Sequence, residues 1–181
     1  MVAVISFFAR CAWYLVPMGA ANLAPFLVRR VFPRLAVPID VLVKRPGLFG
    51  PHKTLRGILI APIAGTAVFA LQKFLSVGDT IAGLGFFSYS DMTLWFGFVA
   101  GCGAIMGDVF RAAVKRRLGI RPGGRFFPFD QMDYVLGGMF LTLGFYQPTW
   151  QIVLGTLMVG ILVHSAINLA GYALGMKEDS L

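Results

Sequence analysis

Residues 107–133 read GDVFRAAVKRRLGIRPGGRFFPFDQMD, and apolar sequence flanks this stretch on both sides. It holds three carboxylates, Asp108, Asp130 and Asp133, together with six Lys and Arg residues. Carboxylates are costly in or near a bilayer and usually mark a functional site there. Asp130 and Asp133 are three positions apart, so in a helix they project from one face. The stretch therefore predicts a charged site held between two membrane helices.

The composition indicates a membrane protein. Of its 181 residues, 57% are apolar and 13% are charged, whereas an average soluble chain has about 45–50% apolar and about 25% charged residues. The net charge of +8 could indicate a nucleic-acid partner. Here the positive charge lies in two loops between apolar runs, as orientation in a bilayer requires, so no nucleic acid is expected. We expect one polytopic membrane domain over residues 1–181.

Apolar runs recur along the chain at the length that a bilayer needs. A spanning helix takes roughly 20 mostly apolar residues. The first run is interrupted by Pro17 and Pro25, and the fourth is short for a bilayer. The sequence predicts an all-α bundle of five transmembrane helices, at about 3–28, 57–75, 91–112, 132–146 and 150–174.

Lys and Arg residues set the expected orientation of this bundle. They dominate the loops 29–56 and 113–131, which five spans place on the same side as the C-terminus. An excess of Lys and Arg marks the cytoplasmic side of a membrane protein. We therefore expect the N-terminus outside and the C-terminus in the cytoplasm. The two basic loops can then converge on one site at the cytoplasmic face of the cell membrane.

Glycine spacing in the third predicted span favours close helix packing. Gly97 and Gly101 form one G-x-x-x-G pair, and Gly103 and Gly107 form another. Such pairs let two helices approach closely in a membrane. Gly107 is expected to have a functional role as well, because it adjoins Asp108.

A second basic element, LFGPHKTLRG at residues 48–57, comes directly before the second predicted span. Thr54 is the expected N-cap, and a helix N-terminus preceded by Gly, Pro and Lys53 is suited to bind an anion. The alternative is an anchor whose cations touch anionic lipid head groups. Because an acidic site is expected on the same face of the membrane, phosphate binding is favoured over the lipid anchor. Asn22, near the cytoplasmic end of the first span, either bonds another helix or contacts a base or ribose.

The charged residues of the opening stretch suit metal-assisted phosphate chemistry. Mg²⁺ is usually held by one or two carboxylates together with substrate phosphates. Phosphoryl and nucleotidyl transfer depend mostly on positioning and on stabilisation of charge. Two other interpretations stay open from the residues alone. Lys115, Arg116 and Arg117 could simply mark the cytoplasmic end of a span, and the three aspartates could pair with nearby arginines.

The motifs together resemble those of the archaeal CDP-archaeol synthases, relatives of the CDP-diacylglycerol synthases, over nearly the whole chain. The resemblance is carried by four sequence elements: Gly50-Pro51-His52-Lys53-Thr54 with Arg56-Gly57, then Gly107-Asp108, then Lys115-Arg116-Arg117, and Pro128-x-Asp130-Gln131-x-Asp133.

The resemblance implies a nucleotidyltransferase. It would move CMP from CTP to the isoprenoid ether lipid 2,3-bis-O-geranylgeranylglycerol 1-phosphate, giving CDP-archaeol and pyrophosphate, with Mg²⁺. Asp108, Asp130 and Asp133 would hold the metal, and Lys115 would act in catalysis with them. The nucleotide and its phosphates would be bound by residues from both loops and their flanks: Asn22, Lys53, Thr54, Arg56, Gly57, Gly107, Arg116 and Arg117. The isoprenoid chains would enter from the membrane between helices.

Two other functions are weighed against this one. A CDP-alcohol phosphotransferase requires an Asp-Gly-x-x-Ala-Arg motif, which the chain lacks. A small anion transporter calls for ionisable residues near the middle of the membrane or for an inverted repeat. The charges of this chain gather at one interface instead.

Overall fold

The computed structural model describes residues 2–77, 83–121 and 124–173, with side chains up to residue 170, and over these ranges it is helical. The long helices are α1 (Val2–Leu27), α3 (Leu55–Leu75), α5 (Trp95–Arg117), α6 (Phe129–Leu141) and α7 (Trp150–Ala173). The short ones are η1 (Val28–Arg30), η2 (Pro33–Leu35), α2 (Ile39–Leu42) and η3 (Thr142–Gly144). The all-α prediction is confirmed for the part of the chain described.

Four helices are long and apolar enough to cross a membrane: Val2–Arg30, Leu55–Leu75, Trp95–Arg117 and Trp150–Ala170. These agree closely with four of the predicted spans, and α1 continues through Pro17 and Pro25. The fourth predicted span, 132–146, is different. The helix there, α6, has 13 residues and ends in the 3₁₀ turn η3. At 1.5 Å per residue it extends about 20 Å, less than the hydrocarbon thickness of a bilayer, so five full spans are not confirmed.

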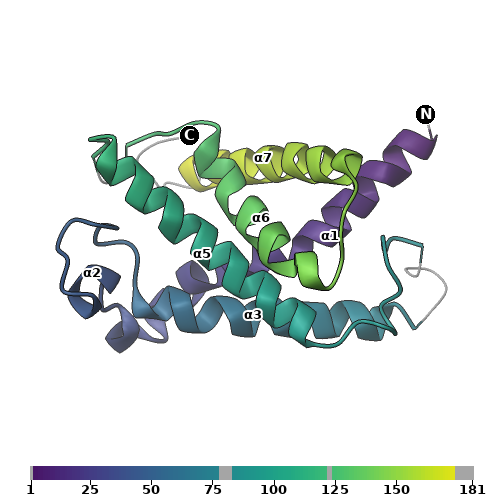
Figure 1. Ribbon diagram of the computed structural model, residues 1–181, viewed down its shortest axis with the longest axis horizontal. Helices are drawn as coiled ribbons and strands as arrows, with labels where there is room; N and C mark the ends of the chain where they lie inside the picture. The colour runs from purple at the N-terminus through teal and green to yellow at the C-terminus, as the bar shows by residue number, and fades with distance from the viewer. Residues whose placement is uncertain (1, 78–82, 122–123, 174–181) are drawn as a thin grey trace.

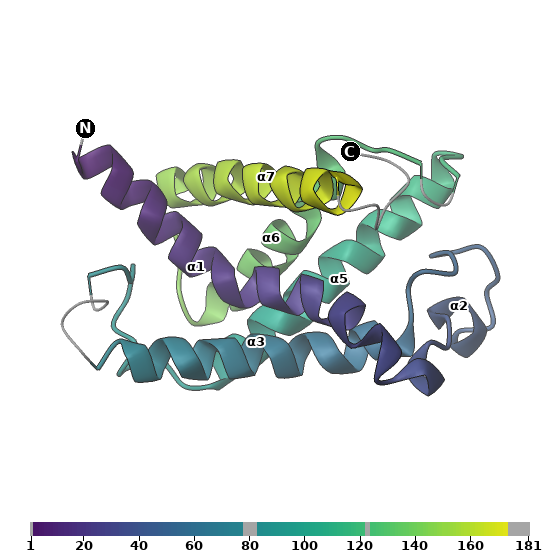
Figure 2. The same ribbon diagram turned by 180° about the vertical axis from the view of Figure 1, so that it is seen from behind.

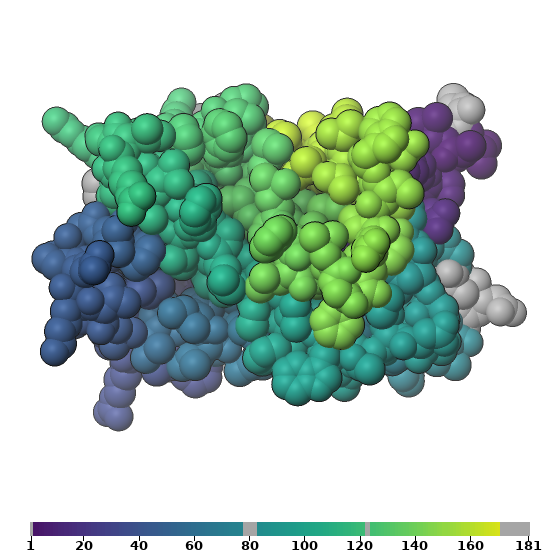
Figure 3. Space-filling model, in the orientation of Figure 1, coloured from purple at the N-terminus to yellow at the C-terminus, as the bar shows by residue number. Residues whose placement is uncertain are grey.

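The helices bring both basic loops to one end of the molecule. In Figure 1, α3 runs along the lower edge and α7 along the upper edge, with α5 and α6 between them. Helix α1 lies behind these and comes to the front in Figure 2. The start of α1 lies at the end opposite α2 in both views. Figure 3 shows the segment around α2, in blue, beside the C-terminal part of α5 and the chain after it, in green.

Aromatic side chains pack the opposite end of the bundle. The ring centroids of Phe69 and Phe96 are 4.8 Å apart, and those of Phe87 and Phe96 are 5.1 Å apart. Tyr14 of α1 contacts the same cluster. Phe69 lies in the second half of α3, and Phe96 lies in the first turn of α5. The cluster therefore joins α3 and α5 at the ends far from Lys53 and Lys115, and it contacts the middle of α1.

Helices α5 and α6 touch backbone to backbone. A Cβ atom on Gly103 would overlap the carbonyl oxygen of Gly137, and one on Gly107 would overlap that of Asp133. The other pair, Gly97 and Gly101, meets α3 in the same way. The predicted role of both glycine pairs in helix packing is therefore confirmed. The α5–α6 contact places the last turns of α5 beside the first turn of α6.

Replacing Gly103 by alanine should destabilise the protein by about 1–3 kcal/mol, because the added methyl group forces the two backbones apart. Gly144→Ala is the matched control, since nothing lies within 4 Å of a Cβ atom there. The measurement is the thermal unfolding of both variants in detergent. Equal melting temperatures for Gly103→Ala and the native protein would contradict this description of the contact.

Candidate active site

Three elements supply the charged residues of the site. The last turns of α5 carry Asp108, Arg111 and Lys115. Their spacing of three and four residues places them on one face of the helix. Helix α6 begins after Pro128 and carries Asp130 and Asp133 near its N-terminus, where carboxylates are favoured by the helix dipole. The third element is the segment before α3.

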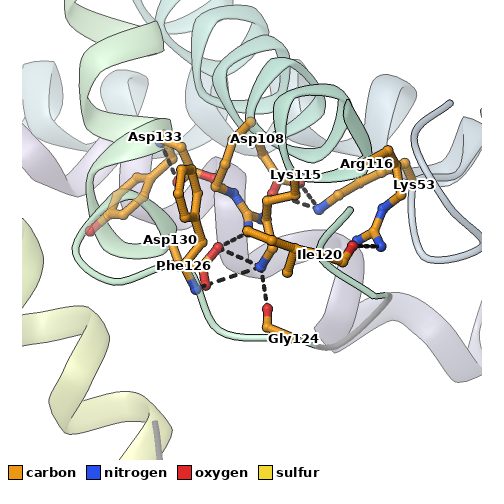
Figure 4. Close-up of polar contacts among 11 residues, drawn as sticks. Lys53, Asp108, Lys115, Arg116, Ile120, Gly124, Phe126, Asp130 and Asp133 are labelled. Atoms are coloured by element: carbon orange, nitrogen blue, oxygen red, sulfur yellow. Dashed lines mark hydrogen bonds and ion pairs between the residues drawn. The ribbon is translucent and has the colours of Figure 1, made fainter. Parts of the chain in front are cut away.

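That segment contributes Lys53, whose Nζ atom lies 2.5 Å from a carboxylate oxygen of Asp108. Figure 4 shows Lys53, Asp108, Lys115 and Asp130 gathered from the separate elements. Residues 55 positions apart in sequence thus meet in one ion pair. The structure confirms that the two basic loops converge.

Arg111 lies at the centre of the three carboxylates. Its Nη2 atom is 2.5 Å from Asp108 Oδ1, and its Nε atom is 2.5 Å from Asp133 Oδ2. Its Nη1 atom donates to Asp130 Oδ1. One guanidinium therefore bonds all three aspartates, whose side chains are between 5% and 20% exposed. Sequence reasoning did not single out this arginine.

Lys115 completes the network on the side of the loop that follows α5. Its Nζ atom lies 2.9 Å from Asp130 Oδ1 and also donates to the carbonyl oxygen of Gly124. Burial alone would raise the pKa of Asp130. The hydrogen bond from Lys115, the charge of Arg111 and the backbone N–H of Phe126 together hold that pKa below its ordinary value. Asp130 is therefore a carboxylate at neutral pH.

The acidic side chains of this network are paired with cations. Asp108, Asp130 and Asp133 form ion pairs with Lys53, Arg111 and Lys115. Buried charges are stable only when they are paired and hydrogen-bonded. The interpretation that the aspartates pair with nearby cations is therefore correct for this structure. This pairing does not exclude a functional site, because a charged ligand can replace the aspartates as the partner of these cations.

A cavity of about 280 Å³, here called the polar cavity, lies against this network. Its wall includes Lys53, Lys115, Arg116, Asp130 and Gln131. The Nε atom of Arg116 and the Oε1 atom of Gln131 are buried there without a hydrogen-bond partner among the described residues. Buried polar atoms are normally paired, so an unpaired donor and acceptor on a cavity wall suit a polar ligand.

Two apolar grooves lead to the polar cavity from different sides. The α1–α7 groove, of about 760 Å³, shares His164 and Asn168 with the cavity wall. The α5–α6 groove, of about 750 Å³, shares Arg111 with it and also contains Asp133. Both grooves are lined mainly by aliphatic and aromatic side chains. A charged cavity that opens onto apolar surface suits a ligand with a polar head and apolar chains.

Comparison with known proteins identifies the family. A family model described as CarS-like CDP-archaeol synthase matches residues 2–180. The chain belongs to the CDP-archaeol synthase family. Curated CDP-archaeol synthases are similar to it over most of their length. The one from Methanopyrus kandleri is 31% identical over 92% of this chain and 89% of its own. The one from Saccharolobus islandicus is 32% identical over 91% of this chain and 90% of its own.

A solved structure is also similar to this CDP-archaeol synthase family member. It is described as an intramembrane enzyme for archaeal membrane lipid biosynthesis. It is 27% identical, with a TM-score of 0.59, and the match covers 83% of this chain and 92% of that chain. The family resemblance inferred from the motifs is confirmed, and so is the character of an enzyme with membrane helices.

Within this CDP-archaeol synthase fold, the predicted site residues fall into two groups. Asp108, Asp130, Asp133, Lys53 and Lys115 meet in the network, and Arg116 joins them on the cavity wall. The remaining predicted residues lie outside the described wall of the polar cavity: Asn22, Thr54, Arg56, Gly57, Gly107 and Arg117.

Each residue of the second group has another structural setting. Asn22 lines the α1–α7 groove. Thr54 occupies the N-cap position of α3 without a side-chain capping bond, so its predicted capping bond is not present. Arg56 donates to the backbone carbonyls of Arg29 in η1 and of Phe32, and a Cβ atom on Gly57 would face Ile105. Arg117 is exposed at the end of α5. Their roles toward a nucleotide stay predictions.

Proposed function

We propose that the protein transfers the CMP group of CTP to an archaeal ether lipid phosphate, 2,3-bis-O-geranylgeranylglycerol 1-phosphate. The products are CDP-archaeol and pyrophosphate. The observation that carries the proposal is the polar cavity, walled by cations and open to two apolar grooves, in a chain of the CDP-archaeol synthase family. Cations suit the triphosphate, and the grooves suit isoprenoid chains.

The reaction needs little help from a general base. A phosphomonoester has a second pKa of about 6, so the lipid phosphate is largely ionised at neutral pH. One of its oxygens attacks the α-phosphorus of CTP, and the bond from that phosphorus to the bridging oxygen of the β-phosphate breaks. Pyrophosphate leaves with the bonding electrons. The demand on the protein is to position two anions and to offset their repulsion.

Five cations are in place for this task. The polar cavity is lined by Lys53, Arg111, Lys115, Arg116 and Arg125. Three of them, Lys53, Arg111 and Lys115, are bonded to aspartates, and the Nε donor of Arg116 has no partner among the described residues. Guanidinium and ammonium groups form strong, charge-assisted hydrogen bonds with phosphate oxygens. A triphosphate in the cavity would therefore compete with the aspartates for these cations.

If the triphosphate bound these cations, the aspartates would be free to bind Mg²⁺. Their hard oxygen donors fit this ion. Within residues 2–77, 83–121 and 124–173, however, no group of acidic, histidine or cysteine side chains is arranged to hold a metal directly. The carboxylates of Asp108, Asp130 and Asp133 face Arg111 instead. These three would hold Mg²⁺ once their cations turn toward the nucleotide, and the ion would offset charge on the phosphate oxygens.

The lipid would reach the polar cavity sideways from the membrane. Both apolar grooves are bounded by helices, and each meets the charged wall directly. The basic segment around η1, η2 and α2 lies at the same end of the bundle. An excess of Lys and Arg marks the cytoplasmic side. We therefore place the active site of this multi-pass protein at the cytoplasmic face of the cell membrane.

Purified protein given CTP labelled at the α-phosphate, Mg²⁺ and the lipid phosphate should form a labelled lipid and release pyrophosphate in equal amounts. ATP, GTP and UTP in parallel reactions test the preference for CTP. The same lipid without its phosphate group is the control and should yield no product. No transfer from any nucleotide, together with turnover of a CDP-lipid and an alcohol, would replace this proposal by a CDP-alcohol phosphotransferase.

A further inference from the structure

Asp40 is a buried acid within an otherwise basic loop. Its carboxylate accepts three backbone N–H groups, with distances of 2.8 Å from Phe49 to Oδ1, and 3.0 and 3.1 Å from Gly47 and Gly50 to Oδ2. The residue is 8% exposed. A side chain that only balanced surface charge would lie in solvent. This one is placed instead to hold the backbone of residues 47–50.

The held segment leads directly into the wall of the polar cavity. Residues 49–53 all line that wall, and Lys53 at their end bonds Asp108. Gly50, with a φ of +93°, adopts a left-handed conformation that favours glycine. A Cβ atom there would lie 3.7 Å from Arg116 Nε. The loop backbone thus runs beside the unpaired donor of Arg116.

The two ends of this loop are tied together as well. The N–H of Ile39 donates to the carbonyl oxygen of Lys53 at 2.8 Å, and the N–H of Leu55 donates to that of Val37 at 2.9 Å. These bonds fix where the loop starts and ends. They leave the conformation of residues 43–50 to be set by other contacts, and Asp40 supplies three of them.

We propose that Asp40 is a positioning residue for the nucleotide. It acts through the backbone of residues 47–50, which it holds so that the following segment forms one wall of the nucleotide site and Lys53 reaches the phosphates. This role rests on the proposed function, in which the polar cavity binds CTP. Asp40 itself does not line the described wall of the polar cavity.

Asparagine in place of Asp40 is the informative substitution. A carboxylate has two acceptor oxygens, whereas a carboxamide has one acceptor and one donor group. Whichever way the amide faces, its NH₂ group meets at least one backbone N–H, donor against donor. The size of the side chain is unchanged, so packing around it is preserved. Asp91→Asn removes the same charge from an exposed acid before α5 and serves as the matched control.

The first measurement is backbone hydrogen exchange in detergent, without nucleotide. In Asp40→Asn, the amides of Gly47, Phe49 and Gly50 should exchange at least about tenfold faster, while those of α5 stay unchanged. This readout does not depend on any reaction. Unchanged exchange at these three amides would overturn the proposal, and so would faster exchange throughout α5, because the effect would then be loss of the fold.

The second measurement is CTP binding and steady-state kinetics. The Kd and KM for CTP should rise at least about tenfold in Asp40→Asn, with a much smaller change in kcat and in the KM for the lipid phosphate. Asp91→Asn should match the native protein. Native affinity for CTP in Asp40→Asn would overturn the positioning role. Failure of the native protein itself to bind CTP would instead overturn the proposed function.

Discussion

Asp108→Asn is expected to lower kcat for CMP transfer by about 10²–10³-fold, as does removal of other groups that stabilise charge at a reacting centre. Asp108 joins the loop before α3 to helix α5, because it accepts from Lys53 of the loop and from Arg111 of its own helix. Asparagine keeps the shape of the side chain but removes the charge that attracts both cations and a divalent ion. The measurement is kcat for CMP transfer at saturating CTP and Mg²⁺.

The same substitution at Asp130 or Asp133 should have a comparable effect, since each of these residues also bonds Arg111. Asp91→Asn is the control, and it should retain native activity because Asp91 precedes α5 at the end far from the cavity. All variants should insert in the membrane and be purified in detergent like the native protein. Full activity in any two of the three site variants would remove the assignment of these aspartates to the metal.

Much of the site was predictable because its residues carry their own signals. Acids beside apolar runs are rare and costly, which singled out Asp108, Asp130 and Asp133. Glycine pairs predicted that the third span packs closely against other helices, and they did not indicate which ones. Arg111 carried no such signal, because arginines are common near the cytoplasmic end of any membrane span. Its role comes from two aspartates 19 and 22 positions away, and only the helix crossing brings them together.

Several predicted site residues that lie outside the cavity wall are next to residues that line it. Lys53 lines the polar cavity, but Thr54 pairs with Pro38, and Arg56 turns toward η1. Neighbours in a loop point in different directions. The backbone conformation that decides this is set by contacts with distant residues, such as the hydrogen bonds that tie Lys53 to Ile39 and Leu55 to Val37. The length of α6 was equally hard to predict, because the apolar run continues beyond the point where the helix ends.

Arg111→Gln should make the folded protein less stable without Mg²⁺ and more responsive to it. Losing the guanidinium leaves Asp108 and Asp130 with Lys53 and Lys115 as ion-pair partners and removes the arginine from the buried carboxyl group of Asp133. Removing one partner from a buried ion pair costs about 3–5 kcal/mol. The remaining negative charge then attracts a divalent cation that no longer competes with the arginine. The measurement is the melting temperature in detergent with and without Mg²⁺, in the absence of nucleotide.

Binding of Mg²⁺ to the folded state alone raises its stability by about 2.7 kcal/mol when the ion is at 100 times its Kd. We expect a gain of this order for Arg111→Gln and a smaller one for the native protein, in which Arg111 occupies the carboxylates. Arg34→Gln, which removes an exposed arginine from η2, should behave like the native protein. If Mg²⁺ stabilises Arg111→Gln no more than Arg34→Gln, the three aspartates do not form a metal site, and their role is to hold the cations for the phosphates.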